Sequence, residues 1–114
     1  MQSLKLADRL FPLVLSGEKT HTIRWREPRM HPGPMRYVCE GDTEKTVVVL
    51  VTRCRDVPLS QAAMLVGKQD TWPDETMLSG MREHYPDIGL DDVVQVVEHL
   101  TPWRTEAAHA GESN

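Results

Sequence analysis

A run of β-branched residues near the middle of the chain constrains the fold more than any other feature. The run TVVVLVTRC lies within residues 45–55 and consists mainly of valine and threonine. These side chains fit the pleated, half-buried surface of a sheet. We therefore predict a strand over residues 45–55. Further strands are predicted at residues 20–25, 36–39 and 91–100.

Helix signals occur in three segments, residues 7–16, 60–67 and 73–85. The apolar residues of the first segment end at Gly17, which suits a helix closed by a glycine in the left-handed conformation. Asp8 is the predicted N-cap of this helix, and Ser60 is the predicted N-cap of the second. Asp74 or Thr71 lies near the start of the third.

The order of these elements predicts the fold class. Residues 27–34 contain three prolines and a glycine and are expected to form a loop that could border a pocket. Consecutive strands with few intervening helices favour a curled, mostly antiparallel sheet over a doubly wound parallel one. We predict an α+β fold, a small β-barrel with short helices packed at its side; an open ferredoxin-like sandwich is the alternative. Residues 1–104 are expected to form one domain, and residues 105–114 a disordered tail.

Composition narrows the classes of function. The 114 residues are 39% hydrophobic and 26% charged, as in an ordinary globular protein, and the formal net charge is −4. This charge argues against binding long nucleic acids through bulk electrostatics. Cys39 and Cys54 lack the spacing of a zinc site and are expected to be reduced thiols. No apolar stretch reaches the ~18 residues that span a membrane, so we expect a cytoplasmic protein without a membrane partner.

The stretch GEKTHTIR, residues 17–24, carries the candidate chemistry. Thr22 and Arg24 alternate with His21 and Ile23, so the two polar residues share one face of the predicted strand. Lys19 lies at the turn that enters this strand, where its long stem can bend back over Thr22. Each residue also has an ordinary interpretation, as a solvated turn lysine, a strand-forming threonine or an arginine in a structural ion pair.

Two stretches of the chain resemble a known family. GEKTHTIR resembles the GxKxxExR-type signature that opens ASCH domains, which belong to the PUA-like superfamily. With threonine in place of the signature glutamate, it is similar to the form found in small bacterial N4-acetylcytidine amidohydrolases. ETMLSGMREHYPD, residues 75–87, resembles a second segment of that group. The resemblance implies a PUA-like (ASCH) barrel and a hydrolase that releases acetate from N4-acetylcytidine or a related N-acylated nucleoside.

The resemblance also implies the catalytic residues, namely Lys19, Thr22 and Glu75. Amide hydrolysis needs a nucleophile, a base that takes its proton and a donor for the departing amine, and these three side chains supply one of each. A covalent acetyl-threonine and direct attack by a lysine-activated water both remain open. No metal or cofactor is required. Arg24 is expected to hold the pocket or the substrate.

Substrate contacts are less defined. Trp72 and Tyr37 could each stack on a nucleobase, whereas Trp25 is expected to pack in the interior. Glu18, His21 and the loop over residues 26–37 depart from the family pattern and leave the substrate preference open. The expected partner is a small nucleoside. The alternative function is a non-catalytic PUA-like module that binds RNA or a modified nucleotide. A ribonuclease is a third and weaker alternative. The oligomeric state stays open.

Overall fold

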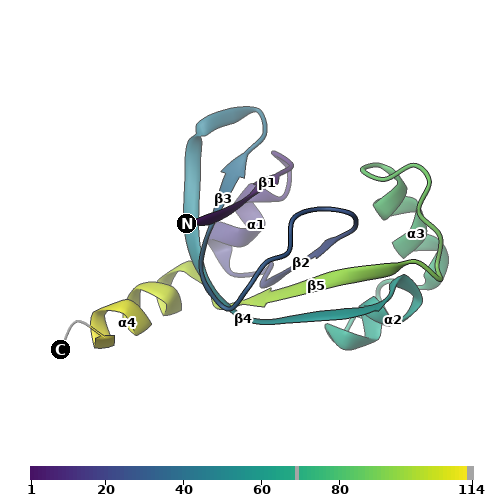
Figure 1. The fold of residues 1–114 in the computed structure, drawn as a ribbon. Coiled ribbons are helices and arrows are strands. Elements are labelled where there is room, and N and C mark those ends of the chain that lie inside the picture. Colours follow the sequence, from purple (N-terminus) through teal and green to yellow (C-terminus); the bar gives the residue numbers. More distant parts are fainter. Residues whose placement is uncertain (69, 113–114) are drawn as a thin grey trace. The chain divides into compact units, whose positions relative to one another are not determined.

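The computed structural model describes residues 1–68 and 70–112. Within these residues the chain forms five strands and four helices (Figure 1). In chain order the elements are β1 Gln2–Leu6, α1 Phe11–Ser16, β2 His21–Arg24, β3 Gly33–Cys39, β4 Asp42–Pro58, α2 Leu59–Leu65, α3 Asp74–Arg82, β5 Val93–His99 and α4 Pro102–Glu112. The predicted α+β class is confirmed.

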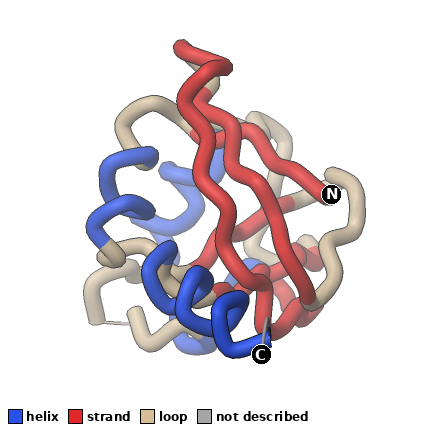
Figure 2. Tube along the Cα trace, turned by 90° about the vertical axis from the view of Figure 1, so that its left-hand side faces the viewer, coloured by secondary structure: helices blue, strands red, loops and turns tan. Residues whose placement is uncertain are grey.

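The strands form one mixed sheet in the order β1-β3-β4-β5-β2. β1 pairs with β3 in parallel, with Leu4 opposite Tyr37. β3 and β4 form an antiparallel hairpin around a turn at residues 40–41 (Figure 2). Strand β1 was not predicted, although Leu4 and Leu6 alternate with polar residues and are both buried. Five residues are a short signal, and the pairing with β3 is what stabilises them as a strand.

The chain divides into two compact units. Unit 1 comprises Met1–Thr22, Met30–Cys54 and the segment that begins at Val97; unit 2 comprises Ile23–Arg29 and Arg55–Val96. That residues 1–104 form one domain stays a prediction.

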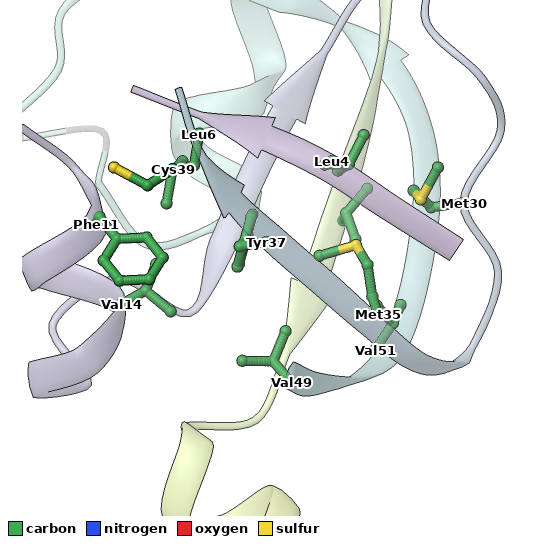
Figure 3. Packing of buried hydrophobic residues seen from close by; sticks show 11 residues of the cluster. Leu4, Leu6, Phe11, Val14, Met30, Met35, Tyr37, Cys39, Val49 and Val51 are labelled. Carbon is green, nitrogen blue, oxygen red and sulfur yellow. The ribbon is translucent and has the colours of Figure 1, made fainter. Parts of the chain in front are cut away.

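Each unit has its own hydrophobic core. In unit 1, side chains from β1, α1, β3 and β4 pack together (Figure 3), and the core consists of Leu4, Leu6, Phe11, Val14, Met30, Met35, Tyr37, Cys39, Val49, Val51 and Val97. In unit 2, α2 and α3 pack with β5, and the core consists of Leu59, Ala62, Ala63, Met77, Met81, Ile88, Val94 and Val96. The β-branched runs predicted as strands thus supply core residues to both units.

Two predicted helix caps are wrong. Helix α1 begins at Phe11, after Leu10 and with Pro12 in its first turn, so Asp8 lies outside it. Helix α2 begins at Leu59, and Ser60 lies inside its first turn rather than at the N-cap. The backbone N–H groups of Leu59 and Ser60 instead donate to carbonyls of the loop before β5, at 2.9 and 3.0 Å. Tertiary contacts therefore satisfy the groups that a cap would otherwise satisfy.

Helix α4 occupies most of the segment expected to be a disordered tail. It continues through Glu112, and residues 113–114 lie outside the described residues. Thr105 ties the helix to unit 1, because its hydroxyl accepts the Leu50 N–H at 2.8 Å and donates to the Thr101 carbonyl at 2.9 Å. That residues 105–114 form a disordered tail stays a prediction.

The Asp8 carboxylate holds the hairpin turn between β3 and β4. It accepts the Gly41 N–H at 2.6 Å and the Cys39 thiol at 3.2 Å. These two bonds lower the pKa of Asp8, and the carboxylate in turn raises the pKa of the Cys39 thiol. Cys39 is thus a buried, unreactive thiol.

We expect Gly41→Ala to destabilise the protein by about 1 to 3 kcal/mol. A Cβ at this position would lie 2.8 Å from Asp8 Cγ and would displace the carboxylate from both donors. Gly80→Ala is the matched control, because a Cβ there meets nothing within 4 Å and alanine favours the helix. Urea unfolding of both variants measures the difference. Equal stability of Gly41→Ala and the parent chain would contradict the role given to Asp8.

Candidate functional site

The motif GEKTHTIR begins at a tight reversal after helix α1. Gly17 ends the helix with φ +83°, as predicted, and its N–H donates to the Val14 carbonyl at 3.2 Å. The N–H of Lys19 donates to the Leu13 carbonyl at 3.0 Å, which folds the chain back before β2 begins. Trp103 covers this turn, since a Cβ at position 17 would lie 2.9 Å from its Cζ2. Only glycine suits both the conformation and the space.

The two candidate catalytic residues in unit 1 are shielded from solvent to different degrees. Lys19 is half-buried, unlike a solvated turn lysine. Thr22 lies in β2 and is 4% exposed. A reaction at the Thr22 hydroxyl therefore requires that the reacting group reach a nearly enclosed position.

A buried polar pair lies in unit 1. The Tyr37 hydroxyl is 2.9 Å from Nε2 of His99, and Nδ1 of His99 is 2.8 Å from the Leu100 carbonyl oxygen. A carbonyl can only accept, so Nδ1 carries the proton. In the neutral ring Nε2 is then the acceptor, and the Tyr37 O–H donates to it. The two rings also meet edge to face, with centroids 5.4 Å apart.

Lys19 acts electrostatically on this pair. The backbone N–H of His99 donates to the carbonyl of Thr20, the residue after Lys19, at 2.9 Å. Burial lowers the pKa of His99, the bond to the Leu100 carbonyl opposes this effect, and the Lys19 charge lowers the pKa further.

His99 was not among the predicted site residues, and Tyr37 was predicted to stack on a nucleobase. Tyr37 has 0% exposed surface, which leaves its ring no free face for a nucleobase (Figure 3). His99 is 4% exposed, at the end of a strand whose burial is not a simple alternation. A histidine among the apolar residues of VVQVVEH was the available signal. Its partner Tyr37, 62 residues earlier, could not be identified without the tertiary structure.

The arginine of the motif belongs to unit 2 and has a partner there. Nη1 of Arg24 lies 3.4 Å from Oε1 of Glu27, and the side chain of Arg24 is 12% exposed. The other oxygen of Glu27 accepts a hydrogen bond from the Tyr85 hydroxyl. Trp25 meets Tyr85 edge to face at 6.0 Å. The ion-pair interpretation of Arg24 is thus observed, and the pair anchors the loop after β2.

Arg26 adopts a backbone conformation that is uncommon for a residue with a side chain. Its φ is +56°, and its guanidinium carbon lies 4.1 Å from the centroid of the Trp25 ring. The left-handed backbone turns the chain immediately after β2, and the cation–π contact orients the arginine side chain.

Glu75 and Trp72 are also in unit 2. Glu75 is exposed in the first turn of α3, where a carboxylate is favoured by the helix dipole. Trp72 is half-buried against the unit 2 core, and its backbone N–H donates to the Lys68 carbonyl at 2.8 Å. Because Lys19 and Thr22 belong to unit 1, the convergence of Lys19, Thr22 and Glu75 stays a prediction.

We expect the protein to lose stability as the pH falls below about 6.5, the ordinary pKa of histidine. The pKa of His99 is lowered in the folded state, so the unfolded chain takes up this proton first on acidification. The thermal midpoint of the parent chain should therefore fall between about pH 7 and pH 5, and less so in His99→Gln. Parallel curves for the two proteins would contradict the assignment.

Metal binding requires a cluster of ligating side chains, and membrane insertion of a helix requires a long apolar segment. Within residues 1–68 and 70–112 we find no cluster of three or more histidine, cysteine or acidic side chains that could ligate a metal. In the same part of the chain, every helix is too short or too polar to cross a membrane.

Solved structures with the same fold come from Zymomonas mobilis. A tyrosine-to-phenylalanine variant of ZmASCH matches with a TM-score of 0.66 and 10% identity, covering 88% of this chain and 68% of that chain. A serine-to-alanine variant of ZmASCH matches with a TM-score of 0.65 and 10% identity, covering 88% and 67%. No family model and no curated protein matches the sequence. At this identity the likeness concerns the fold alone, and the chain has an ASCH-like α+β fold, as the motif resemblance predicted.

Proposed function

We propose that this protein is an amidohydrolase that removes the acetyl group from N4-acetylcytidine, or from a related N-acylated nucleoside, to give cytidine and acetate. The observation that carries the proposal is the environment of Lys19. The motif lysine is half-buried, and its charge lowers the pKa of the buried His99. The ASCH-like fold and the threonine form of GEKTHTIR add support.

In the proposed first step, Oγ of Thr22 attacks the acetyl carbonyl carbon. The neutral amine of Lys19 takes the hydroxyl proton, since a threonine hydroxyl is a poor nucleophile without a base. The bond between the acetyl carbon and N4 then breaks, and its electron pair passes to N4. The Lys19 ammonium gives this proton to N4, directly or relayed through the Glu75 carboxylate, so that Lys19 is neutral again and cytidine leaves.

In the proposed second step, water attacks the acetyl ester on Thr22. Lys19 takes the proton from the water, acetate is released, and Oγ of Thr22 recovers a proton. The alternative is a single step in which water, activated by Lys19, attacks the substrate directly. The 4% exposure of Thr22 bears on this choice, because a nucleophile must reach within about 3.5 Å of the carbonyl.

Trp72 and Arg24 have distinct roles in the proposal. Trp72 supplies an aromatic face for the pyrimidine ring, and such stacking is worth about 1 to 3 kcal/mol per base. Arg24 acts through Glu27 and Tyr85 by fixing the loop that follows β2.

The direct test is incubation of the purified protein with N4-acetylcytidine and measurement of cytidine and acetate. Equimolar release of both products supports the proposal. No release from the nucleoside or from its nucleotide, together with tight binding to a short RNA, would replace the proposal with a non-catalytic binding module.

Glu75→Gln should lower kcat by about 10- to 100-fold, because the glutamine retains the size of the side chain but cannot transfer a proton. Asp74→Asn is the matched control, since Asp74 is exposed in the same first turn of α3. Steady-state kinetics of the two variants separates a proton-transfer role from a favourable charge at the helix N-terminus. Equal losses in both variants would point to the helix charge alone.

A further inference from the structure

The loop after β2 carries three arginines, and two of them have carboxylate partners. Nη1 of Arg24 lies 3.4 Å from Oε1 of Glu27, and the Arg29 guanidinium pairs with the Asp56 carboxylate. The third arginine, Arg26, is exposed, and no carboxylate in the part of the chain that the structure describes pairs with it. The loop therefore presents one positive charge whose N–H donors face solvent.

The backbone that follows Arg26 is anchored to other parts of unit 2. The Tyr85 hydroxyl donates to the Glu27 carboxylate. The side-chain amide of Gln95, in strand β5, donates to the Pro28 carbonyl at 3.2 Å. Two successive residues after Arg26 are thus held by side chains that come from distant parts of the sequence, which limits the movement of the loop.

The guanidinium of Arg26 is placed on an aromatic ring. Its central carbon lies 4.1 Å from the centroid of Trp25, and Trp25 in turn meets Tyr85 edge to face at 6.0 Å. A cation–π contact uses the charge of the guanidinium and leaves its N–H donors available for hydrogen bonds. The side chain is therefore oriented while it keeps the donors that could bind an anion.

The backbone conformation of Arg26 gives no local reason for an arginine. Its φ is +56°, and no other described residue with a side chain has a positive φ. Glycine would adopt this conformation with less strain. A turn that served the fold alone would be accommodated more easily by glycine, so the explanation for the arginine lies in its side chain.

We infer that Arg26 is a phosphate contact, so that the proposed amidohydrolase takes a nucleoside monophosphate in preference to the free nucleoside. A guanidinium binds phosphate through paired N–H···O bonds, and phosphate is the anion that a nucleoside derivative carries. Arg26 follows the proposed nucleophile Thr22 by four residues in the chain. The preference for a nucleotide rests on the proposed function, whereas the phosphate contact does not.

The phosphate contact is tested by NMR with inorganic phosphate as the probe. The Nε–H signals of the two exposed arginines are identified by their loss in Arg26→Gln and Arg29→Gln. Phosphate should shift the Arg26 signal saturably, whereas the Arg29 signal should move little because Asp56 already pairs with that guanidinium. Potassium chloride of equal ionic strength should shift neither signal. Equal shifts of both signals, or no saturable shift of the Arg26 signal, would overturn the contact.

The preference for a nucleotide is tested with N4-acetylcytidine 5′-monophosphate and N4-acetylcytidine as substrates. The parent chain should show at least about a tenfold higher kcat/KM for the nucleotide, mainly through a lower KM. Arg26→Gln should lose this preference. Arg29→Gln removes an equal charge from the same loop and should keep it. Equal losses in the two variants would assign the preference to net charge and count against the contact at Arg26.

RNA is the other source of phosphate for this site. N4-acetylcytidine within a short RNA is therefore included as a third substrate. Slower hydrolysis of this RNA than of the nucleotide supports the inference. Faster hydrolysis of the RNA, lost in Arg26→Gln, would overturn the nucleotide and make the phosphodiester the partner of Arg26.

The inference and the proposed function fail in different ways. A saturable phosphate shift at Arg26, with none of the substrates hydrolysed, would refute the reaction and support the contact. Hydrolysis of nucleoside and nucleotide at equal rates, without a phosphate shift, would support the reaction and refute the contact.

Discussion

Replacing Lys19 by methionine is expected to reduce kcat/KM for N4-acetylcytidine by at least about a hundredfold, the usual scale of a lost general base. Methionine fills a similar volume along the turn between α1 and β2 but has no amine to accept a proton. The half-buried position of Lys19 should make the loss of stability small, because the turn is held by the backbone bonds of Gly17 and Lys19. Cytidine release under steady-state conditions measures the effect.

Lys19→Arg is the informative control. Arginine keeps the positive charge but stays protonated at any pH of interest, so it cannot act as a base. We expect it to be as inactive as Lys19→Met. Substantial activity in Lys19→Arg would reassign Lys19 to electrostatic stabilisation of the reacting carbonyl. Full activity in both variants would remove Lys19 from the mechanism.

Replacing Thr22 by valine is expected to reduce kcat by at least about a thousandfold if its hydroxyl is the nucleophile. Valine keeps the β-branched shape that suits strand β2, so the fold should be retained. Thr22→Ser keeps the hydroxyl and should retain a substantial part of the activity. Rapid quenching of the parent chain during turnover, followed by mass spectrometry, should show one acetyl group on the peptide that carries Thr22.

The two substitutions together distinguish the covalent route from direct attack by water. The covalent route requires both Lys19→Met and Thr22→Val to be inactive. An active Thr22→Val beside an inactive Lys19→Met, with no acetylated peptide, would establish direct attack. Thr22 is 4% exposed, and a buried threonine in a strand can serve packing alone. The comparison therefore decides whether its hydroxyl takes part in the reaction.

The side-chain types in short segments of the sequence were sufficient to predict several structural elements. The valine and threonine run was correctly predicted as a strand, now β4, because β-branched side chains favour this conformation at each position. Gly17 was correctly predicted to close helix α1 in the left-handed conformation, because other residues adopt a positive φ only with strain. Alternation within GEKTHTIR was sufficient to predict β2.

Helix starts and the C-terminal segment depended on partners far away in sequence. Asp8 has the chemistry of an N-cap, yet it bonds Gly41, 33 residues later. Thr105 bonds Leu50, 55 residues earlier, and belongs to helix α4. A side chain that can satisfy a backbone group nearby can equally satisfy one brought close by folding, and local patterns do not distinguish the two.

The candidate site likewise depends partly on local sequence and partly on tertiary contacts. The sequence by itself determined the motif residues Lys19, Thr22 and Arg24 and the strand that carries two of them, because spacing and side-chain type are properties of a short segment. Only the tertiary structure identified the buried His99 and showed that Tyr37, a candidate base-stacking ring, is the buried donor to it. The tautomer and burial of that pair arise from strands β3 and β5 and from the Leu100 carbonyl, which come together only when the chain folds.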